Sequence, residues 1–442
     1  MAEPRAAMLR LSALVGERAL FENDAYRKLW IAKLLSATPA NAVVYAMLLL
    51  VVDATGRSFS SSLFVAAYIA PTALLGTVSG VFVDRAPKGI VLALTNAARV
   101  GLCLLLAIST DNVAVLYVLA VLFAIAGQFS GPAESAALPA VVPAEQYTAA
   151  NSLNNLGGLI SQVAGLMILP AVFLKTAGAE ALAIACAVMF GIAAFNFLLV
   201  DGLGGPVSDV RMSLDDARER FAQAWHRLTL DSVSYISVVI VVLANTTALI
   251  VATLLPRYAS QVLQIGTENV IFVITPAALG IGLSLRFVRN MSGRVSPWWS
   301  VGGSFAALVA GVMLCAFVRP FGDRLEAWNL FGLFDPGPFG EGTARILLTM
   351  ALAAGLAFAF TFVNVVTRSI VNERMPREMQ GRVFAAQSVL TNLASIPPIL
   401  LTGLLADVIG VSPVFFFVGL VCGALALFYA ARNLASPART AY

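Results

Sequence analysis

Long apolar runs are the feature that most constrains how this chain can fold. Each is about as long as the roughly 20 predominantly apolar residues that a helix needs to cross a membrane. The runs are ordered as six, then a hydrophilic stretch, then six more. They lie near residues 29–52, 60–83, 89–109, 112–135, 149–174 and 179–200, and then near 231–255, 266–288, 297–318, 343–371, 384–408 and 411–431. The sequence therefore predicts an all-α polytopic membrane protein with twelve transmembrane helices.

The composition agrees with this prediction and excludes two classes of protein. Hydrophobic residues make up 59% of the 442 residues and charged residues only 12%, whereas soluble domains carry about 25% charged residues. So few charges cannot cover the surface of a soluble enzyme of this size, and so much apolar chain does not stay disordered. We expect a multi-span carrier with little mass outside the bilayer.

The cations of the loops and termini set the expected orientation, because cytoplasmic loops are enriched in Lys and Arg. With the N-terminus inside, twenty of these cations lie on the inner side and five on the outer side. Both termini are therefore predicted to be cytoplasmic, with the helices in the plasma (inner) membrane. The net charge of +4 follows from the same bias, and we expect no binding to nucleic acid.

Two short repeats indicate that the two sets of six runs are related. Residues 71–76 (PTALLG) are similar to 276–280 (PAALG), and residues 142–145 (VPAE) to 375–378 (MPRE). Because parallel six-span repeats characterise one large class of transporters, we expect two pseudo-symmetric six-helix halves. The predicted segments are an N-terminal cytoplasmic segment 1–28, a first bundle 29–200, a connector 201–230, a second bundle 231–431 and a cytoplasmic tail 432–442.

The connector is predicted to contain one helix. Leu214, Ala217, Phe221, Trp225 and Leu228 recur at helical spacing, with most of the charged residues off this stripe. Such an amphipathic pattern is typical of a helix that lies on the inner leaflet. A helix that binds a partner protein is the alternative.

Polar side chains inside the apolar runs are the candidate substrate contacts. Hydrocarbon penalises unpaired polar groups, so we expect these residues to face the bundle interior or a water-filled path. Hydrogen bonding between helices, without any substrate, would explain each of them equally well. The candidate cavity residues are Asn41, Tyr45, Tyr68, Gln128, Asn155, Gln162, Asn245, Asn364 and Gln387, and the deepest charges of the first half are Lys33 and Arg99.

Residues that carry catalytic or metal chemistry are scarce. The four cysteines lie far apart inside apolar runs, and His226 is the single histidine, which leaves no zinc-ligand spacing and no His-based catalysis. The chain contains no HExxH, GxSxG or P-loop motif. We therefore predict no enzyme activity, no cofactor and no metal site.

The loop between the second and third runs carries a recognisable motif. Residues 80–89 read Gly-Val-Phe-Val-Asp-Arg-Ala-Pro-Lys-Gly, which resembles motif A of the major facilitator superfamily. Residues 139–143 with 150–153, and 375–378 with 381–383, look like the branch that contains macrolide-efflux and enterobactin-exporter-like proteins. The resemblance covers almost the whole chain. It implies the major facilitator fold, transport by alternating access, and proton coupling.

The resemblance also implies a cytoplasmic gate at this motif. Gly80 would let its helix approach a neighbour closely, and Asp84 would pair with a cation or cap a helix N-terminus of the opposite half. Arg85 and Lys88 would reach carboxylates or lipid headgroups. The alternative for the two basic residues is that they only anchor the loop at the cytoplasmic face.

The chain departs from the family pattern at two places. Related exporters usually have an arginine where this chain has Glu134, so we hypothesise a rearranged gate in which Glu134 pairs with Arg85, Lys88 or Arg382. The Gly-Pro signature of drug–proton antiporters is absent from the fifth run. Proton coupling is therefore implied by the resemblance more than by the residues themselves.

The expected function is a monomeric secondary transporter that exports an amphipathic or hydrophobic small molecule by alternating access. Its expected partners are that substrate, the lipid bilayer and protons as the coupling ion. Two alternatives stay open: a transporter-like protein with a binding or sensing role, and a carrier for lysolipids or other metabolites.

Overall fold

Every regular element among the described residues is a helix. The structure is a computed structural model and describes residues 18–204, 214–266, 269–291, 297–328 and 342–434. Most of the predicted N-terminal segment, part of the connector and most of the tail lie outside these ranges. The apolar composition of the runs explains why helices form, because a helix satisfies all of its own backbone groups where no water is present.

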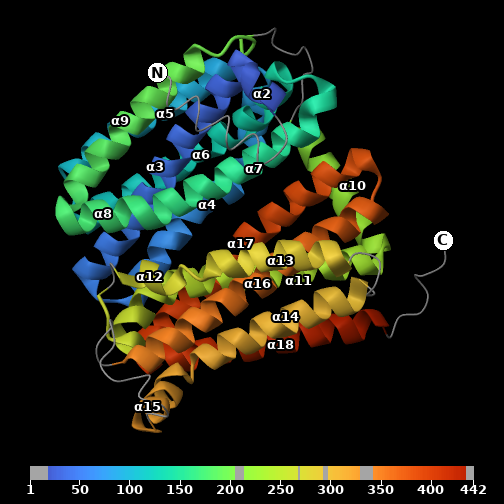
Figure 1. The fold of residues 1–442 in the computed structure, drawn as a ribbon. Helices are drawn as coiled ribbons and strands as arrows, with labels where there is room; N and C mark the ends of the chain where they lie inside the picture. The colour runs from blue at the N-terminus through green and yellow to red at the C-terminus, as the bar shows by residue number, and fades with distance from the viewer. Residues whose placement is uncertain (1–17, 205–213, 267–268, 292–296, 329–341, 435–442) are drawn as a thin grey trace. The chain divides into compact units, whose positions relative to one another are not determined.

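The helices follow the predicted runs closely (Figure 1). In the first half they are α2 (Arg18–Glu22), α3 (Asp24–Thr55), α4 (Ser58–Asp84), α5 (Lys88–Ala107), α6 (Val113–Val141), α7 (Tyr147–Val163), α8 (Leu169–Thr176) and α9 (Gly178–Leu198). In the second half they are α10 (Leu214–Leu230), α11 (Ser232–Tyr258), α12 (Val270–Ile274), α13 (Ala277–Met291), α14 (Pro297–Cys315), α15 (Val318–Trp328), α16 (Thr343–Arg374), α17 (Arg377–Ile409) and α18 (Val411–Leu434).

By length and hydropathy, nine helices of the described residues can each cross a membrane, or ten if α14 and α15, bent by 66°, count as one span. The fifth predicted run is α7 and α8 joined through a π-helical turn at Ala164–Ile168, and the eighth is split into α12 and α13. The predicted all-α polytopic fold is confirmed, and its helices are consistent with the predicted number of twelve. Helix α15 was not expected, because charged residues interrupt its sequence.

The contacts divide the chain into two compact units. The first contains residues 1–54 and 67–214, and the second contains 55–66 and 215–442. In the first unit α5 packs between α6 and α9, and in the second α16 packs against α13 and α14 while α14 lies beside α18 (Figure 1). The beginning of α4 therefore belongs with the second unit, where the Asp407 carboxylate of α17 accepts hydrogen bonds from the backbone N–H groups of Ser58 at 2.6 Å and Phe59 at 3.0 Å.

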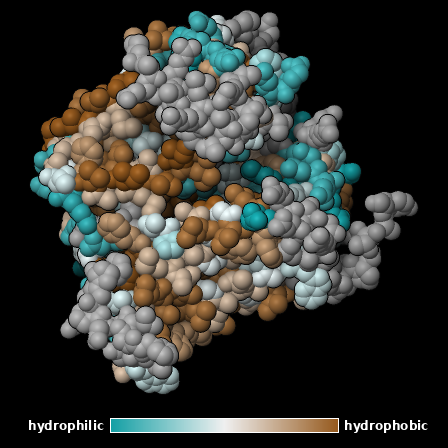
Figure 2. All heavy atoms as spheres, viewed as in Figure 1, coloured by the Kyte–Doolittle hydropathy of each residue, from teal (hydrophilic) through white to brown (hydrophobic). Residues whose placement is uncertain are grey.

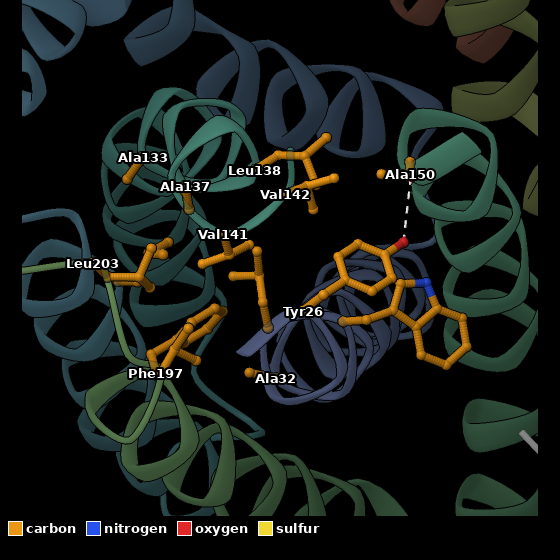
Figure 3. Close-up of a cluster of buried hydrophobic side chains, with 14 of the residues drawn as sticks. Tyr26, Ala32, Ala133, Ala137, Leu138, Val141, Val142, Ala150, Phe197 and Leu203 are labelled. Atoms are coloured by element: carbon orange, nitrogen blue, oxygen red, sulfur yellow. Dashed lines mark hydrogen bonds between the residues drawn. The ribbon is translucent and has the colours of Figure 1, made fainter. Parts of the chain in front are cut away.

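A buried apolar cluster lies at the end of the first unit where α3 begins and α6 ends (Figure 3). Tyr26, Phe197 and Leu203 are among its buried members, and they come from α3, α9 and the start of the connector. The Tyr26 hydroxyl donates to the carbonyl of Ala150 at 3.3 Å, and the Trp30 indole N–H donates to that of Leu153 at 3.1 Å. These bonds tie α3 to α7 and satisfy the polar ends of two buried aromatic residues.

Large apolar side chains also cover the outside of the helices (Figure 2). Leu94, Phe195 and Leu427, for example, are each more than half exposed. A soluble monomer rarely exposes apolar surface on this scale, whereas a bilayer requires it. The surface therefore fits a protein that is embedded in lipid.

The apolar stripe of the connector helix contacts protein in its second half. The Trp225 ring meets the Tyr235 ring edge-on at 5.9 Å, and Leu228 is buried with Val371 and Met375. The side chains of Leu214, Ala217 and Phe221 lie outside the described residues. The predicted helix is present, and Trp225 and Leu228 of its stripe pack against other helices of the second unit.

Candidate functional site

The loop that resembles motif A, between α4 and α5, is short, and Lys88 binds backbone carbonyl oxygens in and beside it. Helix α4 ends at Asp84 and α5 begins at Lys88. The Lys88 ammonium donates to the carbonyl oxygens of Val83 at 2.6 Å, of Asp84 at 3.1 Å and of Ala86 at 3.1 Å. The last carbonyls of a helix lack partners within the helix and carry the negative end of its dipole. Lys88 therefore caps the C-terminus of α4, a role that the pattern of an ion-pairing gate did not predict.

The same loop is attached to the start of the connector. Gly89 is buried, and its N–H donates to the carbonyl of Leu203 at 3.4 Å. A side chain at position 89 would lie 3.2 Å from Leu203 Cβ. The loop that resembles motif A thus contacts the segment that leads from the first bundle into the connector.

Within the described part of the first unit, no neighbouring helix lies close to Gly80, and the helix approach predicted there stays a prediction. Among the described residues no atom of another helix lies within 4 Å of the position that a Cβ of residue 80 would occupy. Within the first unit the close approach is at Gly165, where a Cβ would meet Thr38 O and would lie 2.7 Å from Asn41 Cβ. Gly165 belongs to the π-helical turn between α7 and α8, which brings this turn against α3.

Of the three partners hypothesised for Glu134, Lys88 instead donates to backbone carbonyl oxygens, and the pairings with Arg85 and Arg382 stay predictions. The Glu134 carboxylate lies 3.8 Å from the ammonium of Lys33 on α3. Lys33 is about 14 Å along α3 from its first residue, and Glu134 is about 11 Å before the last residue of α6, at about 1.5 Å per residue. Glu134 therefore belongs with the charges inside the bundle.

Arg99 on α5 completes this group of charges. Its side chain is buried, with 6% exposed, and one terminal nitrogen donates to the Ser36 hydroxyl at 3.2 Å. The guanidinium lies 5.5 Å from the centre of the Phe190 ring of α9. Glu134 interacts electrostatically with both Lys33 and Arg99. We call Lys33, Arg99 and Glu134 the charge cluster; it joins α3, α5 and α6 of the first unit.

Some of the remaining polar candidates of the first unit form hydrogen bonds within the protein, and others are half-buried or exposed. The Gln128 amide of α6 donates to the Thr72 hydroxyl of α4 at 2.8 Å, and the Asn41 amide donates to Ala37 O of its own helix at 2.9 Å. Tyr45 and Tyr68 are half-buried, and Tyr68 interacts electrostatically with Arg99. Asn155 and Gln162 are exposed on α7.

Two candidates of the second unit meet each other. The Asn245 amide of α11 donates to the side-chain oxygen of Asn364 on α16 at 3.4 Å. Each amide also donates to the carbonyl four residues before it, to Val241 and to Phe360. Gln387 and Arg382 are half-buried on α17.

An apolar cavity of about 210 Å³ lies near this amide pair. Helices α11, α14 and α16 form its walls, and its lining residues are Thr247, Ala248, Val251, Ala252, Leu255, Leu308, Val312, Leu356, Ala357 and Phe360. Most of this lining is apolar and has no distinguishing pattern in the sequence, although Asn245 and Asn364 are close to it along the chain. A larger hollow of about 630 Å³ at residues 107–114 and Glu180 lies at a loop.

Among the described residues, no three His, Cys, Asp or Glu side chains are grouped as metal ligands. Ser36 and Phe190, which hold Arg99, were not predicted, because a hydroxyl and a ring inside apolar runs have no distinguishing sequence pattern.

Comparisons with known proteins agree with this architecture. The Major Facilitator Superfamily profile matches residues 29–396. An uncharacterized MFS-type transporter, YfiS of Bacillus subtilis strain 168, is 32% identical over 167 residues, which cover 35% of this chain and 38% of that relative. The chain thus matches well under half the length of this curated relative.

Three solved structures share the fold, each with a TM-score of 0.68. They are the nucleoside transporter NupG (12% identity, 93% of this chain and 98% of that one), a POT family transporter in complex with 5-aminolevulinic acid (10%, 93% and 96%), and a bacterial homolog to the human lysosomal transporter Spinster (12%, 92% and 98%). The profile match over most of the chain shows that this protein belongs to the major facilitator superfamily.

Proposed function

We propose that this protein is a secondary transporter that exports an amphipathic or hydrophobic small molecule by alternating access, driven by protons, in the manner of the macrolide-efflux and enterobactin-exporter-like branch. It would act in the plasma membrane with both termini in the cytoplasm. The observation that carries the cargo class is the cavity between α11, α14 and α16, because its lining is almost entirely apolar.

The size of this cavity limits its role. At about 210 Å³ it is smaller than the roughly 300 Å³ of a typical small-ligand pocket. It would therefore hold one apolar group of the cargo rather than the whole molecule. The adjacent amide pair of Asn245 and Asn364 would supply a polar contact that fixes the orientation of that group.

Filling the cavity is expected to abolish export while the protein stays folded. Ala357→Trp places an indole among Leu308, Leu356 and Phe360. Cells that express wild type should accumulate at least one member of a panel of dyes, macrolides and lysolipids less than vector-only cells, and the variant should return accumulation to the vector level. We expect a loss of about tenfold or more in export, the effect of about 1.4 kcal/mol of lost binding.

The matched control is Ala424→Trp on α18, an exposed alanine outside the cavity. It should export as wild type does. Normal export by Ala357→Trp would remove the cavity from the cargo path, and equal accumulation in wild-type and vector-only cells across the panel would contradict export itself.

A further inference from the structure

The charge cluster contains one positive charge in excess. Lys33 and Arg99 are both cationic at neutral pH, whereas Glu134 supplies a single carboxylate. This carboxylate forms an ion pair with Lys33 at 3.8 Å. In the described part of the chain no carboxylate lies within 4 Å of Arg99. The second cation is therefore only partly compensated.

Arg99 also has an unused donor. Of its nitrogen atoms, one bonds to Ser36, and the guanidinium face lies over Phe190. Its buried Nε has no hydrogen-bond partner among the described residues. A buried donor without a partner is destabilising, and a buried charge without a counter-ion more so. An ionisable group of this kind inside a membrane span is therefore a candidate for ligand binding.

Two members of the charge cluster are partly exposed. The side chains of Lys33 and Glu134 are 28% and 19% exposed, and both residues lie near one end of the predicted apolar runs 29–52 and 112–135. Ionised groups in a membrane span do not face lipid, because hydrocarbon penalises them strongly. Their exposed surface is therefore the side from which we expect water and a ligand to reach the cluster.

Besides Ser36 and the two other members of the charge cluster, the surroundings of Arg99 include apolar side chains. Phe190 covers one face of the guanidinium, Cys103 of the next helical turn is fully buried, and Ala32 and Ala133, the chain neighbours of Lys33 and Glu134, are fully buried in the apolar cluster of Figure 3. Guanidinium groups bind carboxylate and phosphate in preference to neutral groups.

We propose that the charge cluster binds an anionic group, a carboxylate or phosphate, of the transported molecule, so that the cargo is an anionic amphiphile. The anion accepts from Arg99 Nε and neutralises the excess charge, while Glu134 remains the counter-ion of Lys33. This inference rests on the proposed function and narrows it from amphipathic molecules in general to those with a negative charge.

The test measures binding of three matched probes to the purified protein in nonionic detergent. They are a dansyl-labelled fatty acid, its methyl ester and the corresponding alkyl-trimethylammonium compound, followed by dansyl fluorescence. The fatty acid should bind about tenfold to a hundredfold more tightly than the ester, the gain expected from a hydrogen bond to a charged group. The cationic probe should bind most weakly.

Three variants test whether the charge cluster itself binds the fatty acid, as opposed to an arginine elsewhere in the protein. Arg99→Gln should lower the affinity for the fatty acid to that for the ester. Arg368→Gln is the matched control, because the Arg368 guanidinium also lies over a ring, 5.2 Å from that of Phe384, but is exposed; it should leave binding unchanged. Glu134→Gln removes the competing carboxylate and should tighten binding of the fatty acid, which gives a test even if Arg99→Gln does not fold.

Equal affinities for the fatty acid and the ester would overturn the anion site while leaving amphipathic export intact. Weaker binding of the fatty acid by Glu134→Gln would also overturn it, and would favour a role of this carboxyl group in carrying protons. Failure of all three probes to bind to wild type would overturn the inference together with the proposed cargo class.

Discussion

Replacing Gly280 by alanine is expected to destabilise the protein by about 3 kcal/mol or more. Gly280 is buried on α13 where this helix packs against α16. A Cβ at this position would press on Ala354 O and would lie 2.9 Å from Ala354 C and 3.0 Å from Phe358 N. All three are backbone atoms, so the clash is relieved only if the two helices move apart. Close backbone approach is what allows helices to associate in a membrane.

The matched control is Gly282→Ala, two positions further along the same helix. Gly282 is exposed, and among the described residues no atom lies within 4 Å of its added Cβ. There the substitution should be neutral or stabilising by about 0.5–1 kcal/mol through helix propensity.

The four cysteines provide the readout, because all are buried and react with a thiol dye only when the fold opens. Gly280→Ala should lower the temperature of this reaction by roughly 5–10 °C. Identical melting curves for the two glycine variants would show that the helices are not held this closely.

Exchanging the charges of Lys33 and Glu134 is expected to restore transport that either single reversal abolishes. At the 3.8 Å that separates Lys33 Nζ from Glu134 Oε2, two unit charges interact by about 4 kcal/mol at an effective dielectric constant of about 20. Glu134→Lys would leave three cations and no carboxylate in the charge cluster. Lys33→Glu would place two carboxylates side by side. The double exchange keeps both the pair and the net charge of the cluster.

The control exchange combines Glu134→Lys with Arg382→Glu, because Arg382 is one of the three partners hypothesised for Glu134 from the sequence. It should not recover transport, because it leaves Lys33 beside a second lysine. Export of a panel substrate from cells is the measurement, with surface expression checked for each variant. Recovery by the Arg382 exchange, or no recovery by the Lys33 exchange, would contradict the assigned pair.

The fold was predictable to the extent that apolar length determines it. The twelve runs end where charges or Pro and Gly begin, so each predicted run falls on a helix. Contacts between helices were not predictable in the same way. Gly80, Gly165 and Gly280 look alike in the sequence, yet only the last two lie where another backbone comes close, because this depends on how the helices pack.

In the candidate site, too, the individual residues were predictable but their contacts were not. Lys33, Arg99 and Glu134 were each recognisable as charges within or beside apolar runs, because charge is rare in such runs. Their grouping was not, since 101 residues separate Lys33 from Glu134 in the chain and no local spacing relates them. Lys88 was interpreted as a gate cation, whereas the three carbonyls that it binds depend on where α4 ends.

Transport by purified protein in liposomes tests the central claim most directly. Proteoliposomes loaded with a fluorescent amphiphile are given an imposed pH gradient, and efflux is followed for wild type and for Asp84→Asn in the loop that resembles motif A. We predict that wild type moves the amphiphile, that the gradient accelerates this movement, and that the variant is reduced to the rate of protein-free liposomes. Efflux by wild type at the protein-free rate would contradict the transport claim, and efflux that ignores the gradient would contradict proton coupling.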